Sequence, residues 1–250
     1  MMPKIETLRL RACDPVAQRQ FYCDVLGMQD IGDGCVGFGG EEAGICFLKA
    51  DRPYVQTASD LYWKITLAVP NIELACEQLT CKGLTVSAPH QFQNVGYLAH
   101  FTDPEGFAVE LIDHWFEGHR PYKPVNPNLL GGGAHLNLIT LRTSSIGRVQ
   151  GVCKGMGMRP LCVQSINRYG FTLYFFAFTQ DVPPSSDLTA IENREWLYQR
   201  RYTVLEVQHV HALESVLTAE GPIGGYAGIV LSGPSKVDSS DDLLMFRNAE

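Results

Sequence analysis

The sequence predicts an α+β protein built from repeated βαβββ units. Three observations carry this prediction: a strand-to-helix element recurs along the chain, short strands follow each copy, and a segment rich in Pro and Gly separates two similar halves. Recurrence of one supersecondary unit is the mark of a repeat architecture. We therefore divide the chain into a module over residues 1–116, a linker over 117–133 and a second module over 134–250.

The first copy of the element passes from a strand at residues 8–11 into a helix that ends near Gly27. Asp14 is a good N-cap, and Pro15 suits the first helical position, where no backbone N–H is needed. Three apolar side chains share one face of this helix: Ala17, Phe21 and Val25. A strand over residues 44–49 completes the pattern, so the first unit reads as strand, capped helix and strands.

The second copy begins with a strand at residues 64–69, continues with a helix through Leu79 that can end at Gly83, and leads to strands between residues 97 and 112. These last strands are joined by Asp103-Pro104-Glu105-Gly106, which has the composition of a tight turn. Pro presets φ early in such a turn, and Gly tolerates the positive φ that closes it. We expect a hairpin here.

Glu110 is a lone carboxylate inside the strand that follows this turn. Phe107, Val109 and Leu111 point to one face of the strand, whereas Glu110 shares the other face with apolar neighbours. An unpaired charge in that position is costly. Either the second face is wet, or Glu110 points into a pocket towards a metal, a charged partner or a substrate.

The second half repeats the order after the linker. A strand at residues 138–142 precedes a helix that ends near Gly157, and strands follow at 171–178 and 202–208. A further first strand is expected at residues 226–231, but the chain ends soon afterwards. The repeat is thus present about three and a half times.

The net charge and the composition of the chain exclude several classes of protein. The formal net charge of −7 and the absence of a basic block disfavour a surface that follows nucleic-acid phosphates. No apolar run approaches the roughly 18 residues of a membrane span, and the N-terminus lacks a signal-peptide core. We expect a cytoplasmic protein that contacts neither nucleic acid nor membrane. Its eight cysteines form no C-x-x-C pair, which predicts reduced, mostly buried thiols.

The chain resembles the vicinal oxygen chelate superfamily, which includes glyoxalase I, bleomycin-resistance proteins and extradiol dioxygenases. The first half carries the motif Phe-Tyr-x-x-Val-Leu-Gly-Met at residues 21–28 and the turn Asp-Pro-Glu-Gly with a Glu four residues later. The second half is similar to glyoxalase I at residues 171–178, 196–201, 203–207 and 224–229. The resemblance implies curved mixed sheets that form cups, with helices outside.

In this superfamily the first and last strands of each unit supply ligands to a divalent metal. Glu110 and Glu206 match such ligand positions and are the metal candidates. Lys64 stands where a His is usual, and four other ligand positions are lost: Thr7, Cys46, Leu138 and Gly228. Neither Leu nor Lys⁺ can coordinate a cation. A divalent metal therefore stays possible as a cofactor, but we do not expect it to be bound tightly.

Glyoxalase I pairs its units across a swapped interface, and the same pairing here would bring Glu110, Glu206 and Lys64 together. Two carboxylates and an ammonium could perform acid/base chemistry without a metal, because like charges raise the pKa of one carboxyl group. They could equally form an ion pair in a defunct site. Arg142 matches a position that contacts a glutathione carboxylate in glyoxalase I, and Arg11 is its counterpart in the first half.

From this resemblance we expect a divergent glyoxalase-like protein that binds a small metabolite. Lyase or isomerase activity like that of lactoylglutathione lyase would depend on Glu110 and Glu206 as catalytic residues, with Lys64, Arg142 and Arg11 as binding residues. The alternative is a catalytically silent module for sequestration, resistance or assembly. The incomplete last unit must have its strand edge covered by the first module or by another chain, and a homodimer is the expected partner arrangement.

Overall fold

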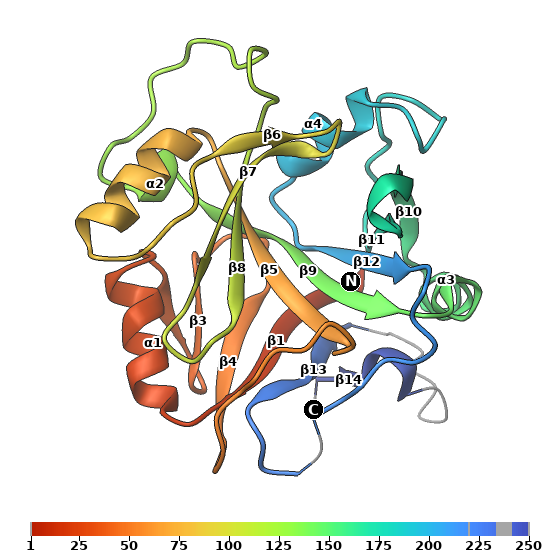
Figure 1. Cartoon of the computed structure of the whole chain (residues 1–250), viewed down its shortest axis with the longest axis horizontal. Coiled ribbons are helices and arrows are strands. Elements are labelled where there is room, and N and C mark those ends of the chain that lie inside the picture. Colours follow the sequence, from red (N-terminus) through yellow and green to blue (C-terminus); the bar gives the residue numbers. More distant parts are fainter. Residues whose placement is uncertain (1, 220, 234–241, 250) are drawn as a thin grey trace.

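The computed structural model describes residues 2–219, 221–233 and 242–249, which form two curved mixed sheets with helices packed around them (Figure 1). The six-stranded sheet has the order β14-β13-β1-β4-β3-β2, and the eight-stranded sheet has the order β10-β11-β12-β9-β5-β8-β7-β6. The strands of the first sequence half are β1 (Lys4–Ala12), β2 (Gln29–Gly32), β3 (Cys35–Gly37), β4 (Gly44–Lys49), β5 (Tyr62–Val69), β6 (His90–Phe92), β7 (Gly96–Thr102) and β8 (Ala108–Asp113). Those of the second half are β9 (His135–Thr143), β10 (Arg159–Ile166), β11 (Phe171–Ala177), β12 (Val204–Val210), β13 (Gly225–Ser232) and β14 (Phe246–Asn248). The helices are α1 (Pro15–Asp24), α2 (Ile72–Cys81), α3 (Ile146–Gly155) and α4 (Glu192–Tyr198), with short 3-10 turns at η1 (Leu130–Gly132), η2 (Asn167–Tyr169) and η3 (Asp242–Leu244).

The predicted α+β fold of repeated units is confirmed by the strand pairing. In each unit the first strand lies parallel to the last, as β1 does to β4, β5 to β8 and β9 to β12. The short β14 lies parallel to β13 in the same way, so a three-residue strand takes the place where the sequence indicated no final strand.

The units pair across the two halves of the sequence. β5 lies antiparallel to β9, and β1 lies antiparallel to β13, so each sheet contains strands from both halves. The edge of the incomplete last unit is therefore covered within the chain by the first unit. The division at residues 116 and 134 stays a prediction about the sequence, and so does the homodimer.

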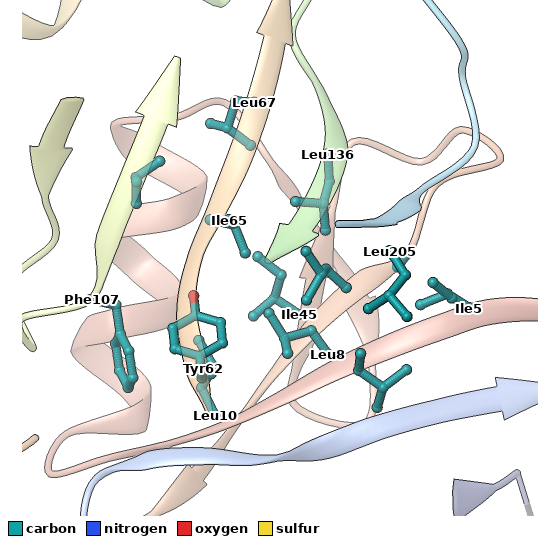
Figure 2. Packing of buried hydrophobic residues seen from close by; sticks show 14 of the residues in the cluster. Ile5, Leu8, Leu10, Ile45, Tyr62, Ile65, Leu67, Phe107, Leu136 and Leu205 are labelled. Carbon is teal, nitrogen blue, oxygen red and sulfur yellow. The ribbon is translucent and has the colours of Figure 1, made fainter. Parts of the chain in front are cut away.

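The main hydrophobic core joins the two sheets. Figure 2 shows Leu8 of β1 and Ile45 of β4 beside Ile65 of β5 and Leu205 of β12, all of them buried. Burial of each such side chain contributes about 1.5 to 3 kcal/mol. Tyr22 and residues of α2 and α3 join the same cluster. The core therefore holds in place the strands that carry the predicted site residues.

Helix α1 begins as predicted, because the side chain of Asp14 accepts hydrogen bonds from the backbone N–H groups of residues 16 and 17. Of the predicted face, Phe21 and Val25 are half-buried against the core and Ala17 is exposed, whereas the fully buried residues are Gln18 and Tyr22. The cause lies in the predicted turn, where Asp103 is 4% exposed. Its carboxylate accepts hydrogen bonds from the Gln18 amide and from the Tyr22 hydroxyl, at 2.9 Å for Tyr22. A polar contact thus sets the orientation of this helix.

The prediction that the cysteines are reduced and mostly buried is wrong for several of them. Cys35 and Cys46 form a disulfide between the adjacent strands β3 and β4, where they are register partners. The remaining six are free thiols, and of these only Cys153 and Cys162 are buried. The sequence does not indicate this disulfide, because the contact between the two cysteines depends on the register of β3 with β4.

No helix within the described residues is long and apolar enough to cross a membrane.

A histidine buried at the start of β9 makes the stability of the fold depend on pH. Burial, helped by the neighbouring His114 and Arg201, lowers the pKa of His135 to about 3. An unfolded chain would protonate this histidine near pH 6.5. The stabilisation from keeping His135 neutral is therefore complete above pH 6.5 and is lost as the pH falls towards 3.

We expect His135→Phe to reduce the loss of unfolding free energy between pH 7 and pH 5 by about 2 kcal/mol, from the linkage of about 1.4 kcal/mol per pH unit and proton. Urea unfolding of both proteins at the two pH values measures this difference. The hydrogen bond between His135 Nε2 and the Asn137 side-chain amide is lost equally at both pH values, so it cancels. An identical pH dependence of the unfolding free energy in the two proteins would contradict the lowered pKa of His135.

Candidate functional site

Four of the five predicted site residues, Lys64, Glu110, Arg142 and Glu206, lie on four neighbouring strands of the eight-stranded sheet. Thr140 of β9 is the register partner of Lys64 on β5 and of Glu206 on β12, so the three residues form one row across the sheet. Glu110 of β8 is the register partner of Thr66, two residues beyond Lys64 on the same face of β5. Neighbouring side chains of one sheet face lie within contact distance. The swapped pairing of the units therefore brings Glu110 to Glu206.

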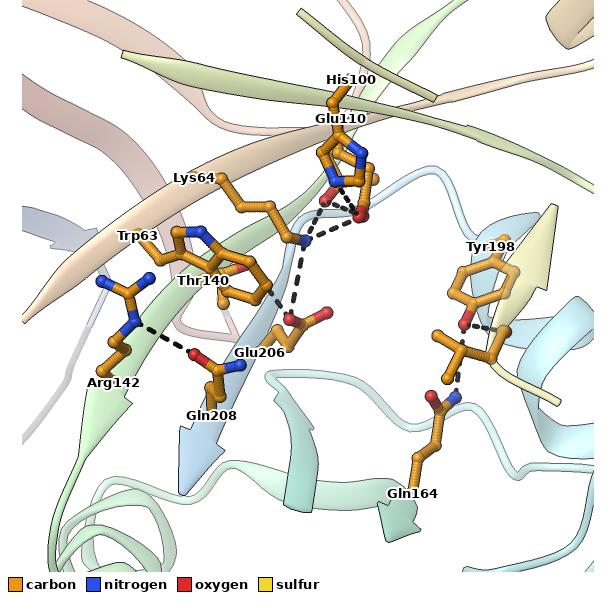
Figure 3. A network of polar contacts seen from close by, with 12 residues as sticks. Trp63, Lys64, His100, Glu110, Thr140, Arg142, Gln164, Tyr198, Glu206 and Gln208 are labelled. Atoms are coloured by element: carbon orange, nitrogen blue, oxygen red, sulfur yellow. Dashed lines mark hydrogen bonds and ion pairs between the residues drawn. The ribbon is translucent and has the colours of Figure 1, made fainter. Parts of the chain in front are cut away.

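The ammonium group of Lys64 lies between the two carboxylates (Figure 3). Its Nζ is 2.8 Å from Oε1 of Glu110 and 3.6 Å from Oε1 of Glu206. It also donates to the hydroxyl of Thr66 at 3.0 Å, and Thr66 donates to Glu110 Oε1 at 2.9 Å. Thr140 donates to Glu206 Oε1 at 3.2 Å. We call Lys64, Glu110 and Glu206 the charged cluster; all three are buried.

The two carboxyl groups of the charged cluster have opposite pKa shifts. Burial raises the pKa of Glu110, but Lys64 and His100 lower it more, so the pKa of Glu110 lies well below its usual range. Burial also raises the pKa of Glu206; Lys64 opposes this shift, and repulsion by Glu110 adds to it, so the net shift is upwards. Attraction to both carboxylates outweighs burial at Lys64 and raises its pKa. Glu206 is thus the member of the cluster that most readily takes up a proton.

The cluster forms one wall of a pocket of about 250 Å³. The other walls are mainly apolar and come from both halves of the chain: Phe92, Leu98, Ile112, Leu138, Phe171 and Leu173. Pockets that combine apolar walls with a few convergent polar groups are the usual form of small-molecule sites. The arrangement is suited to a compact molecule that places one polar group against the cluster.

The residues in this pocket do not fit a divalent metal. Lys64 Nζ occupies the space between the carboxylates at 2.8 Å from Glu110 Oε1, and an ammonium has no lone pair to coordinate a cation. Leu138, at a lost ligand position, lines the same pocket with a hydrocarbon side chain. Across the described ranges, no group of three or more His, Cys, Asp or Glu side chains is arranged to hold a metal ion. We therefore derive no step through a metal.

The predicted binding residues Arg142 and Arg11 do not line this pocket. Arg142 donates through Nε to Gln208 at 3.1 Å and through its terminal nitrogen to the backbone oxygen of Thr57 at 3.0 Å. Its guanidinium also stacks on the Trp63 ring, 5.0 Å from the centroid, while Lys64 Nζ lies 5.0 Å from that centroid. Arg142 therefore positions Trp63 at the pocket. Arg11 lies in the other sheet and donates to the backbone oxygen of Tyr226 at 3.4 Å.

The remaining lost ligand positions lie on the six-stranded sheet. Thr7 and Cys46 line a separate cavity of about 690 Å³ there. Gly228, on the neighbouring strand, has a φ of +121°, and a Cβ at this position would lie 2.6 Å from a backbone oxygen. Any side chain larger than hydrogen would be strained at Gly228. This second cavity therefore lacks both carboxylates of the charged cluster and has a disulfide in its wall.

His100 is a site residue that the sequence did not identify. It is the register partner of Glu110 across the β7–β8 hairpin, and its Nε2 lies 3.0 Å from Glu110 Oε2. The signal was available, because the tight turn at residues 103–106 fixes which residues of the hairpin face each other. Thr66 and Thr140 donate to the same carboxylate oxygens that face Lys64. Their positions in the site also follow from the strand register alone.

Comparison with known proteins gives one family match. The family model of the Glyoxalase/Bleomycin resistance protein/Dioxygenase superfamily matches residues 4–111. No curated protein sequence matches the chain.

Solved structures share the fold at low sequence identity. Glyoxalase I from Zea mays superposes with a TM-score of 0.63 and 17% identity, over 92% of this chain and 74% of that one. A putative dioxygenase from Bacillus subtilis subsp. subtilis str. 168 superposes with a TM-score of 0.54 and 16% identity, over 96% of this chain and 72% of that one. These similarities confirm the expected architecture of curved mixed sheets.

Proposed function

We propose that the chain, whose residues 4–111 match the family model of the Glyoxalase/Bleomycin resistance protein/Dioxygenase superfamily, binds a small, largely apolar molecule in the pocket beside the charged cluster. In this proposal Lys64 supplies the positive charge that a divalent metal supplies in related proteins. The observation that carries the proposal is the convergence of Lys64, Glu110 and Glu206 at the wall of an apolar pocket. A buried charged group of this kind supports recognition of one polar group on a ligand.

Ligand binding can be followed through Trp63, which lines the pocket. We expect neutral aromatic compounds such as 2-phenylethanol to quench its fluorescence with saturation. Trp63→Phe should lose the fluorescence signal while calorimetry still detects binding, because the other walls remain. Leu138→Phe, which places a larger side chain in the pocket, should weaken binding about tenfold.

The matched control is Leu129→Phe, since Leu129 is exposed and lies outside the pocket lining. Circular dichroism checks that Leu138→Phe is folded. Unchanged affinity in a folded Leu138→Phe protein would place the ligand elsewhere and contradict the proposal.

The opposite pKa shifts of Glu110 and Glu206 support a second candidate function, in which the protein isomerises or cleaves its ligand by proton transfer. Pairs of carboxyl groups with separated pKa values serve in other enzymes as acid and base. In an isomerisation, the Glu206 carboxylate would take a proton from one carbon and return it to the neighbouring carbon, while Lys64 offsets the charge of the intermediate enolate.

The test of this candidate is isomerisation of a hemithioacetal, combined with elemental analysis of the protein. Turnover in the presence of a chelator, abolished by Glu206→Gln, would support proton transfer by the cluster. Absence of both bound metal and turnover would leave binding as the function.

As part of the proposal we keep a homodimer, which light scattering would test. β2 offers a fully exposed edge of its sheet for this contact.

A further inference from the structure

The two carboxylate oxygens of Glu206 have different surroundings. Oε1 accepts from Thr140 at 3.2 Å and lies 3.6 Å from Lys64 Nζ. Oε2 points away from Lys64 in Figure 3, and within the described ranges no hydrogen bond or ion pair reaches it. Glu206 lines the pocket although its side chain is only 4% exposed. The pocket thus contains a nearly buried carboxylate with one oxygen available to a ligand.

The other polar atoms deep in the pocket are already paired with each other. Glu110 Oε1 accepts from Lys64 at 2.8 Å, and its Oε2 faces His100 at 3.0 Å. The Tyr198 hydroxyl donates to the backbone oxygen of Val95 at 2.6 Å and accepts from the Gln164 amide at 3.3 Å. A ligand that enters this pocket therefore meets its free polar partner at Glu206.

The charges around Glu206 leave a negative excess. Lys64 faces it from β5, Glu110 from β8 and the neutral Tyr198 from α4, while β9 contributes the hydroxyl of Thr140. On the other side of β12, its register partner in β11 is Phe175, which carries no charge. With Lys64, Glu110 and Glu206 ionised, the cluster has one more negative than positive charge. A buried site of this kind is stabilised by one further positive charge, which either a proton or a cationic ligand can supply.

The aromatic walls favour a cation over an anion. Trp63, Phe92 and Phe171 line the pocket. The faces of such rings attract ammonium groups. The pocket volume of about 250 Å³ is below the range of drug-sized sites, so it suits a molecule with one ring or a short chain.

We infer that the ligand is a compact apolar amine, bound as its ammonium ion, whose N–H donates to Glu206 Oε2 while its hydrocarbon part lies against the aromatic walls. This inference rests on the proposed function, because it names the class of molecule that the pocket binds. The ammonium ion supplies the positive charge that a proton on Glu206 would otherwise supply. Amine binding is accordingly coupled to pH through Glu206.

The test compares three ligands of similar size on the full chain: 2-phenylethylamine, which is cationic at both pH values used, neutral 2-phenylethanol and anionic 3-phenylpropanoate. Isothermal titration calorimetry at pH 8 should show the amine binding at least tenfold more tightly than the alcohol and the anion. At pH 5 the advantage over the alcohol should be smaller than at pH 8, because protons compete with the amine for Glu206. Glu206→Gln should weaken amine binding at pH 8 at least tenfold, whereas the control Leu129→Phe, outside the pocket lining, should leave it unchanged.

The ligand and pH series use the unaltered protein, so the outcome does not depend on the folding of the variant. If the alcohol or the anion binds as tightly as the amine at pH 8, the inference is overturned, although the pocket remains a ligand site. If none of the three ligands binds, both the inference and the proposed function fail.

Discussion

Replacement of Lys64 with Met is expected to lower the free energy of unfolding by about 3 to 5 kcal/mol, the usual cost of removing one partner from a buried ion pair. The side chain of Lys64 is 3% exposed, and those of Glu110 and Glu206 are 7% and 4% exposed. Without the ammonium, two buried carboxylates would face each other with no cation between them. Urea unfolding at pH 7 measures the effect.

Two further variants separate the loss of charge balance from the loss of packing. Lys64→Met combined with Glu110→Gln and Glu206→Gln removes all three charges, and we expect it to regain most of the lost stability, because a neutral cluster no longer carries uncompensated charge. Lys123→Met, at an exposed position, should change stability by less than about 0.5 kcal/mol. A loss below 1 kcal/mol for Lys64→Met alone would contradict the assigned ion pairs.

The second large effect is expected at Asp103, which joins the hairpin turn to helix α1. Its carboxylate accepts from the Gln18 amide, from the Tyr22 hydroxyl and from the backbone N–H groups of residues 105 and 107. Asp103→Ala should lower the free energy of unfolding by about 4 kcal/mol, because each buried donor left unpaired costs about 1 to 3 kcal/mol. Denaturant unfolding with fluorescence detection gives this value.

The conservative variant Asp103→Asn should cost less than half as much as Asp103→Ala, since the amide oxygen can still accept hydrogen bonds. Burial raises the pKa of Asp103 to about 6, and its hydrogen bonds reduce this shift. Its ionised form is therefore disfavoured by the fold, and as the pH rises from 4 to 6 the wild type should lose stability that the Asn variant keeps. Pro104→Ala, on the exposed tip of the same turn, is the control. Equal stability of the Ala and Asn variants would show that the hydrogen bonds to Asp103 do not carry the effect.

The meeting of Glu110 with Glu206 could be predicted because it depends on the repeat. Each residue lies in the last strand of its unit, and a parallel pairing of first and last strands fixes where such a residue stands in the sheet. The swapped pairing of the units, implied by the resemblance to glyoxalase I, then places the two strands on either side of β5 and β9. Local pattern and family resemblance together were sufficient for this part of the site.

Features that depend on a single long-range polar contact could not be predicted in this way. The apolar periodicity of helix α1 favoured the face of Ala17 and Phe21, but Asp103, about 80 residues away in the sequence, draws Gln18 and Tyr22 inwards. The role of Arg142 against Trp63 and the Cys35–Cys46 disulfide have the same origin, because each depends on which side chains meet across neighbouring strands. The apolar periodicity of a segment indicates which of its residues are buried, but it does not indicate which side chains they contact.

We propose that Lys64 takes the place of a divalent metal between Glu110 and Glu206. Anomalous diffraction from crystals of the full chain grown with Mn²⁺ tests it most directly. We expect no anomalous peak between the two carboxylates, with Lys64 Nζ in hydrogen-bond contact with Glu110. An anomalous peak within about 2.5 Å of both carboxylates, with Lys64 turned away, would contradict it.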